Sequence, residues 1–151
     1  MDDHTLVDII FRDSITATQL RGVIAADELQ VINLTTKKPF FYVVNTDDSF
    51  GPGEHWVVVY VPSESEPVEF WDSLGHSPSF YGYFFGQFFR GKYYIYNTMV
   101  LQGGKPVCGH FCIYYAYFRC RGYCLDTIVN SFSADRARND WMVKEFVEKN
   151  I

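Results

Sequence analysis

The sequence predicts an α+β fold, with strands in the middle of the chain and helices toward both ends. Runs of β-branched and aromatic residues cover positions 40–45, 55–61 and 68–72, which is a composition typical of strands. Residues 109–121 and 135–149 follow these runs and have helix-like patterns. Because strands and helices are segregated along the chain, we expect helices layered on a sheet.

The length and composition are those of one globular domain, which we place at residues 1–151. The composition, 48% apolar and 21% charged, is typical of a globular protein. A chain of 151 residues can bury about 70% of the surface that it exposes when unfolded. No apolar run reaches the ~20 residues of a membrane span. The acidic N-terminus, MDDHTLVDII, lacks the basic start of a signal peptide. We therefore expect an intracellular protein with reduced thiols and no membrane partner.

The first third of the chain is expected to hold short helices followed by a strand. Residues 5–20 carry apolar positions at mixed helical spacing, and residues 25–31 resemble another short helix. Residues 40–45 (FFYVVN) form the first predicted strand, which ends in a run of polar turn formers. Residues 49–53 contain Gly-Pro-Gly and are expected to form a loop.

Two further strands flank the turn-forming segment 62–67 (PSESEP), and we expect them to form an antiparallel hairpin. In the register that a tight closure of this turn favours, His55 lies directly opposite Asp72. Directly opposed side chains share a face and have Cβ atoms ~5 Å apart, so a hydrogen bond between these two is expected. The same register pairs Trp56 with Trp71 on the other face.

The second half of the chain is expected to alternate between helices and irregular segments. Residues 79–89 are aromatic-rich and predicted to be helical, and residues 93–100 read as a strand buried on at least one face. Residues 102–107 (QGGKPV) form a loop that leads into a buried helix at 109–121. A terminal helix at 135–149 completes the chain.

Cys108 is the candidate nucleophile because it stands where the helix at 109–121 begins. Unpaired backbone N–H groups and the helix dipole favour negative charge there, and the thiolate is the reactive form of cysteine. His55 can supply the imidazolium that lowers the thiol pKa, and Asp72 can orient the ring. The Gln102 amide, with the backbone N–H of Cys108, can hold a tetrahedral oxyanion. Gly103 and Gly104 would let the backbone bend toward a substrate.

Each of these residues also has an ordinary structural explanation. A cysteine in an aromatic helix is often a small buried hydrophobe, His55 could cap a strand, and Asp72 could start a turn. Their joint order and spacing favours catalysis. The main metal alternative is zinc on Cys108-x-His110-x-Cys112, yet structural zinc sites use short C-x₂₋₄-C pairs on loops, so we expect no metal.

Charge argues against a nucleic-acid partner. The net charge is −5, and only Arg90 and Lys92 accompany the aromatic run between residues 80 and 96. A groove for a phosphate backbone needs clustered Lys and Arg beside stacking rings. Core packing, with a few rings at a peptide cleft, is the use that we expect for these aromatic residues.

Three segments, GEHWVVVYV, EFWDSLG and QGGKPVCGHFC, resemble the adenain-like branch of the cysteine proteases, which includes SUMO-deconjugating enzymes. The family order is His-Trp, an acidic residue on the next strand, a Gln, and Cys-Gly. His55, Asp72, Gln102 and Cys108 match that order. Residues 22–29 (GVIAADEL), with VNTD ahead of GPGEHW, resemble proteases of adenoviruses and Polinton/Maverick-type elements.

The resemblance implies a papain-like α+β fold, with a central mixed sheet between helices and the nucleophile at a buried helix N-terminus. It implies an endopeptidase that cleaves viral or element-encoded capsid and core precursors after Gly-containing sites, in the host nucleus or cytoplasm and in the virion. Trp56, Gly103, Gly104 and Gly109 would contact the substrate. The acidic residue is Asp72, as in SUMO proteases, where adenoviral enzymes commonly carry Glu.

The same resemblance leaves partners and rival functions open. With a net charge of −5, we do not carry over the DNA cofactor of the adenoviral enzymes, and we expect no required cofactor, while a peptide activator stays open. The alternative enzyme is a SUMO-type deconjugating protease that uses the same four residues. A binding module that kept the fold without catalysis, and a zinc module, are the alternatives from other classes.

Overall fold

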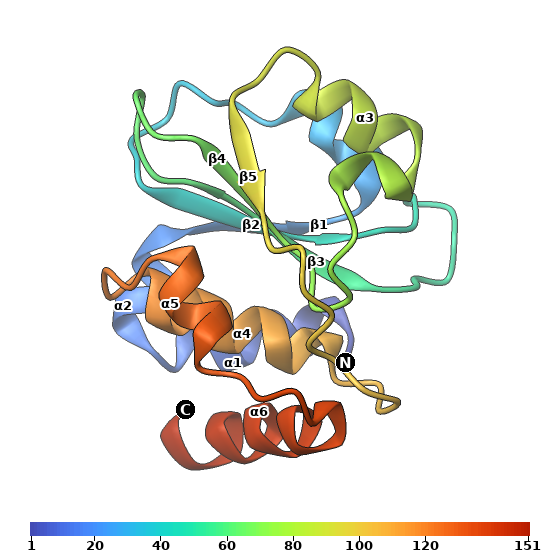
Figure 1. The fold of residues 1–151 in the computed structure, drawn as a ribbon. Coiled ribbons are helices and arrows are strands. Elements are labelled where there is room, and N and C mark those ends of the chain that lie inside the picture. The colour runs from blue at the N-terminus through green and yellow to red at the C-terminus, as the bar shows by residue number, and fades with distance from the viewer.

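The computed structural model describes residues 1–151 and is built on one five-stranded sheet with the order β1-β2-β3-β4-β5 (Figure 1). Strands β1 and β2 are parallel, β2, β3 and β4 are successively antiparallel, and β4 and β5 are parallel. The sheet is therefore mixed, and the predicted α+β class is confirmed. The strands are β1 (Leu20–Ile24), β2 (Phe40–Asn45), β3 (Trp56–Val61), β4 (Val68–Trp71) and β5 (Tyr94–Tyr96).

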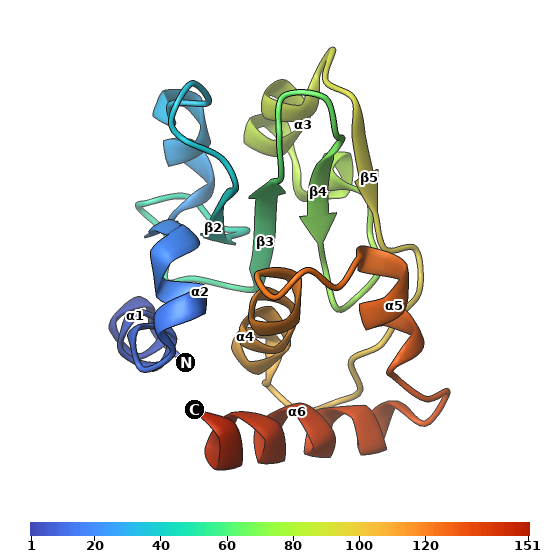
Figure 2. The ribbon, with the colours of Figure 1, turned by 90° about the vertical axis from the view of Figure 1, so that its left-hand side faces the viewer.

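Helices cover both faces of this sheet (Figures 1 and 2). The 3₁₀ helix η1 and helix α3 lie on one face, whereas α1, α2, α4 and α5 lie on the other, and α6 packs against the outer side of α4. None of these helices is long and apolar enough to cross a membrane. The helices are α1 (Asp3–Phe11), α2 (Ser14–Gln19), η1 (Ala26–Val31), η2 (Pro78–Tyr81), α3 (Tyr83–Phe89), α4 (Cys108–Arg119), α5 (Leu125–Asn130) and α6 (Arg136–Asn150).

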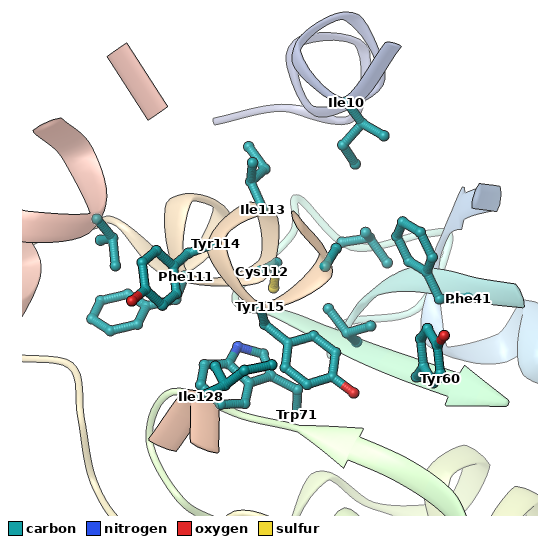
Figure 3. Close-up of a cluster of buried hydrophobic side chains, with 14 of the residues drawn as sticks. Ile10, Phe41, Tyr60, Trp71, Phe111, Cys112, Ile113, Tyr114, Tyr115 and Ile128 are labelled. Atoms are coloured by element: carbon teal, nitrogen blue, oxygen red, sulfur yellow. The ribbon is translucent and has the colours of Figure 1, made fainter. Parts of the chain in front are cut away.

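Two hydrophobic cores result, because successive side chains of a strand point to opposite faces. Trp71 packs into the larger core, where it stacks on Tyr115 of α4 with ring centroids 4.8 Å apart (Figure 3). Its neighbour Phe70 points into the smaller core and meets Phe85 and Phe89 of α3 edge to face. The larger core fixes α4, and with it Cys108, against the middle of the sheet.

The hairpin of β3 and β4 forms, but in a register different from the expected one. Trp71 pairs with Val58, and Phe70 pairs with Val59, so Trp71 does not face Trp56 and His55 is not directly opposite Asp72. The turn that joins β3 and β4 is longer than the tight turn that the sequence prediction assumed. The displacement is two residues, which keeps every side chain on its expected face because the strand period is two. His55 and Asp72 therefore remain on one face as diagonal neighbours.

Two predicted elements differ from the observed ones. The helix expected at 79–89 is divided into η2 and α3 at Gly82, whose φ of +99° is a left-handed value that glycine tolerates. The strand expected at 93–100 shortens to β5, an edge strand that is half-buried and exposed at Ile95. The chain beyond it leaves the sheet because it must reach α4. The short elements β1 and α5 were not anticipated.

Candidate active site

Cys108 is the first residue of α4 and is half-buried. The residue before it, Val107, offers no side-chain cap, so the first backbone N–H groups of the helix lack a capping partner. Burial tends to raise the thiol pKa, yet hydrogen bonds from His55 and from the backbone N–H of Trp56 lower it below the ordinary value. The local environment thus stabilises the thiolate.

His55 stands immediately before β3, and its imidazole connects a carboxylate to the thiol. Its Nε2 atom lies 2.7 Å from Oδ1 of Asp72, which leaves Nδ1 as the ring nitrogen available to Cys108. Burial tends to lower the imidazole pKa, but the hydrogen bonds to Asp72 and Cys108 raise it to about 9. The shifts of the two groups together favour a thiolate–imidazolium pair.

Asp72 follows β4 and is completely buried. Besides His55, its carboxylate accepts hydrogen bonds from the backbone N–H groups of Leu74 (3.0 Å) and His76 (3.1 Å) and from the hydroxyl of Tyr81 (2.5 Å). Burial tends to raise the carboxyl pKa, but the bonds from His55, Tyr81 and Leu74 lower it overall. Asp72 is therefore held as an anion whose lone pairs are used, which fixes the orientation of the His55 ring.

Two supporting residues were not found from the sequence. The ring of Tyr81 stacks on His55 at 5.9 Å between centroids while its hydroxyl reaches Asp72. Asn97 holds the backbone of Asp72 on both sides, accepting from its N–H (2.9 Å) and donating to its carbonyl (2.5 Å). Tyr81 lay within an aromatic run that suggested only packing, and Asn97 lay within a predicted strand, so no local signal marked either one.

Gln102 is buried in the loop before α4, and its amide orientation is set by two neighbours. Ser73 donates to Oε1 at 2.6 Å, and Nε2 donates to the carbonyl of Lys105 at 2.8 Å. An amide nitrogen carries two N–H groups, so one donor of Gln102 remains for another acceptor. This is the donor that the sequence assigned to an oxyanion.

The four residues expected to contact substrate lie in different surroundings. Trp56 lines a cleft of about 700 Å³ that also reaches Cys108. Gly103 packs against α6, and Gly104 has open space around its Cα atom. Gly109 is buried under the N-terminal segment, where a Cβ atom would stand 3.0 Å from the sulfur of Met1. Only Trp56 of the four borders the cleft.

The cleft beside Cys108 is strongly acidic. The N-terminal segment and the loop before β3 both contribute to its walls, and its lining includes no Lys or Arg. None of its carboxylates takes part in an ion pair with a basic side chain. The carboxylates in the lining are Asp2, Asp3, Glu28, Asp48 and Glu54.

The other cysteines differ from Cys108 in reactivity and position. Cys112 is buried, and burial raises its pKa well above the ordinary value. Burial also raises the pKa of Cys120 to about 12. Cys124 is exposed, and a hydrogen bond with Thr127 lowers its pKa. No group of three or more His, Cys, Asp or Glu side chains is placed to hold a metal ion.

A thiol at a helix N-terminus, an imidazole that interacts with it and a carboxylate that orients the imidazole are the parts of a cysteine protease site. The buried Gln102 amide lies in the loop that leads into the thiol. The fold is similar to two crystal structures of the ASFV pS273R protease. The TM-scores are 0.63 and 0.56, each at 15% sequence identity, and the aligned regions cover 94% and 95% of this chain. At that identity the likeness establishes the fold.

The sequence comparison leads to the same relative. The chain is 39% identical over 62 residues to the cysteine protease S273R of African swine fever virus (isolate Tick/Malawi/Lil 20-1/1983), a match that covers 37% of this chain. No family model matches. The match spans 23% of that curated relative, and the chain spans 65% and 66% of the two solved chains. The expected resemblance to viral cysteine proteases, and the cysteine protease fold, are confirmed.

Proposed function

We propose that this chain is a cysteine protease in which Cys108 is the nucleophile, His55 the proton carrier and Asp72 the residue that orients His55. The observation that carries the proposal is the continuous chain of contacts from the buried Asp72 through His55 to Cys108 at the border of an open cleft. A cysteine with a purely structural role would not need an imidazole next to its thiol. The likeness to a viral cysteine protease supports the same assignment.

The proposed reaction follows from these contacts. The Cys108 thiolate attacks the scissile carbonyl carbon, and the oxyanion receives hydrogen bonds from Gln102 and from the backbone N–H of Cys108. The His55 imidazolium then gives its proton to the departing amine, leaving a thioester on Cys108. A water molecule, deprotonated by neutral His55, attacks the thioester, which releases the acid product and restores the thiolate–imidazolium pair.

The proposed substrates are viral or element-encoded capsid and core precursors, cut after Gly-containing sites during maturation of a virion. The similarity to a cysteine protease of African swine fever virus supports this class. The acidic lining of the cleft adds a preference of its own, because carboxylates without basic partners attract Lys or Arg on the substrate. We expect the enzyme to act in the host nucleus or cytoplasm and in the virion, and to require no cofactor, while a peptide activator stays open.

Mass spectrometry that identifies which cysteine a Gly-Gly peptide electrophile modifies tests the proposed nucleophile. Near pH 6 the probe should modify Cys108 in the wild-type chain, and His55→Ala should slow that labelling strongly. Cys124 is the competing thiol because it is exposed and its pKa is lowered. Cys124→Ser is therefore the matched control, and it should leave the labelling of Cys108 unchanged. Equal labelling of Cys108 with and without His55 would contradict the proposal.

Substrate assays distinguish a precursor-processing protease from a SUMO-type deconjugating protease. A fluorogenic Gly-Gly peptide with Lys or Arg before the glycines should be cleaved faster than its Glu counterpart at low salt, and the difference should shrink as salt screens the cleft. Cleavage of a folded ubiquitin-like modifier conjugate in preference to any such peptide would favour the SUMO-type alternative instead.

A further inference from the structure

The loop of residues 101–107 carries Gln102 and leads into Cys108, yet it contains no helix or strand. One end is tied to the turn that follows β4, where the carbonyl of Ser73 accepts from the N–H groups of Leu101 (2.8 Å) and Gln102 (3.0 Å). These two bonds fix only the start of the loop. The remainder must be held from elsewhere for the Gln102 amide to have a defined position.

Asp140 of α6 supplies that support. Its carboxylate is almost completely buried and accepts hydrogen bonds from the backbone N–H of Gly103 (2.8 Å) and of Lys105 (3.1 Å), one at each oxygen. No basic side chain lies within ion-pair distance of it. A buried carboxylate without hydrogen bonds is costly, so these two loop amides are its main stabilising partners.

Gly103 fits this contact and has a packing reason to be glycine. A Cβ atom there would stand 2.8 Å from Oδ2 of Asp140 and 3.2 Å from the carbonyl of Arg136, which is too close for any larger residue without movement. The Gly103 N–H is also occupied by Asp140. The loop therefore approaches α6 closely at this position.

Asn139, the neighbour of Asp140, holds the loop one step earlier. Its Nδ2 donates to the carbonyl of Leu101 (3.0 Å) and to that of Ser133 (2.9 Å), while its Oδ1 accepts from the N–H of Ser133 (3.0 Å). Asn139 is 1% exposed. The two side chains of α6 thus hold the loop on both sides of Gln102.

We propose that Asp140, with Asn139, is a positioning residue for oxyanion stabilisation, an inference that rests on the proposed protease function. The connection is short: Asp140 fixes the N–H of Lys105, and the carbonyl of Lys105 accepts from Nε2 of Gln102. A displacement of Lys105 therefore displaces the amide that donates to the oxyanion. Misplacement of a catalytic group by about 1 Å can cost on the order of 100-fold in rate. The terminal helix acts on the chemistry although it borders neither His55 nor Cys108.

Kinetics of Asp140→Ala and Asp140→Asn on the fluorogenic Gly-Gly peptide test this role. We expect kcat to fall about 10- to 100-fold with little change in KM. Alkylation of Cys108 by iodoacetamide should keep its wild-type rate, because that displacement forms no oxyanion. The matched control is Asp135→Ala, which removes the N-cap bond to the N–H of Arg138 on the same helix without touching the loop. Its kcat should stay at the wild-type value.

A double-mutant cycle decides whether Asp140 acts through Gln102. In a Gln102→Ala background, Asp140→Ala should have little further effect, since the donor that it positions is already gone. An equal loss of kcat in both backgrounds, or a parallel loss of alkylation rate, would overturn the inference. If Asp140→Ala fails to fold, Asp140→Asn serves in both backgrounds because it keeps one acceptor oxygen. A wild-type chain that cleaves no peptide removes the proposed function together with this inference, whereas an active wild type matched by its Asp140 variants removes the inference alone.

Discussion

Two halves of the site meet at Cys108 and are held by different means. The base half consists of His55 and Asp72, which adjoin neighbouring strands and contact each other through side chains. The oxyanion half is an irregular loop whose position depends on Ser73 and on two buried side chains of α6. The base half therefore adjoins the sheet and is further held by Tyr81 and Asn97. The oxyanion half has no regular structure of its own and is fixed by polar contacts with distant parts of the chain.

This difference predicts how turnover and the alkylation rate of Cys108 change when each half is altered. Damage to the base half removes the thiolate–imidazolium pair, so turnover and the alkylation of Cys108 should fall together. Damage to the oxyanion half leaves the thiolate intact, so turnover should fall while alkylation is preserved. The ratio of the two rates thus identifies which half a variant affects.

Asp72→Asn should give the largest effect on the base half. Turnover should fall by about 10⁴-fold, the scale known for the corresponding change in a serine protease triad. Both carboxylate oxygens accept two donors each, so an amide nitrogen would face N–H or O–H groups and the free energy of unfolding should fall by about 1–3 kcal/mol. Peptide hydrolysis and urea unfolding measure the two effects.

The exposed Asp8 on α1 gives a matched control for that change. Asp8→Asn should leave both turnover and unfolding at their wild-type values. A rate within tenfold of the wild type for Asp72→Asn would show that another group orients His55.

Gln102→Ala should give the largest effect on the oxyanion half. Loss of one oxyanion donor should lower kcat by about 10²–10³-fold, or about 2.7–4 kcal/mol of transition-state stabilisation. Iodoacetamide should alkylate Cys108 at the wild-type rate. Gln87→Ala on α3, an exposed glutamine outside the cleft, is the control. Wild-type turnover for Gln102→Ala would remove this amide from the mechanism.

The same division explains what could be predicted from the sequence. The strand at Phe40–Asn45 was found with its observed bounds, and the pairing of His55 with Asp72 was found even though the register was wrong by two residues. The predicted contact was correct despite the register error, because the face of a strand residue depends only on whether its position is odd or even. Local pattern is enough for such a contact.

The oxyanion half was predictable only at Gln102 itself. Asp140 lies 37 residues beyond its partner Gly103, and neither a repeat nor a period connects them. Asn139 and Asp140 also sit in the helix predicted at residues 135–149, where the sequence pattern indicated a helix and no role for either side chain. Contacts of this kind depend on how helices pack, which the sequence of either segment does not specify.

The pH dependence of kcat/KM should separate the two groups of the base half. His55 has a pKa raised from 6.5 to about 9, so the imidazolium that protonates the leaving amine is lost as the pH rises through about 9. The acidic limb should lie below the ordinary thiol pKa of 9.0, because the Cys108 pKa is lowered. Beyond each limb the rate should fall about tenfold per pH unit.

Folding should depend on pH through His55 in a related way. Because its folded-state pKa is raised, its contribution to stability is complete below pH 6.5 and disappears as the pH rises through about 9. His55→Ala should remove this dependence, as urea unfolding at pH 6 and pH 10 would measure. An alkaline limb of kcat/KM that does not shift in Asp72→Asn would contradict the assigned cause of the His55 shift.

Ser73→Ala should give the smallest effect and tests how the oxyanion half orients its donor. The backbone carbonyl of Ser73 still accepts from Leu101 and Gln102 in this variant, so the loop keeps its anchor and only the hydroxyl bond to the Gln102 amide is lost. A hydrogen bond of this kind contributes about 1 kcal/mol, so kcat should fall about fivefold while alkylation of Cys108 is unchanged. Ser65→Ala, in the exposed turn between β3 and β4, is the control. If kcat instead falls as far as in Gln102→Ala, Ser73 alone selects the amide orientation. An unchanged kcat would mean that the Lys105 carbonyl alone is enough to orient the Gln102 amide.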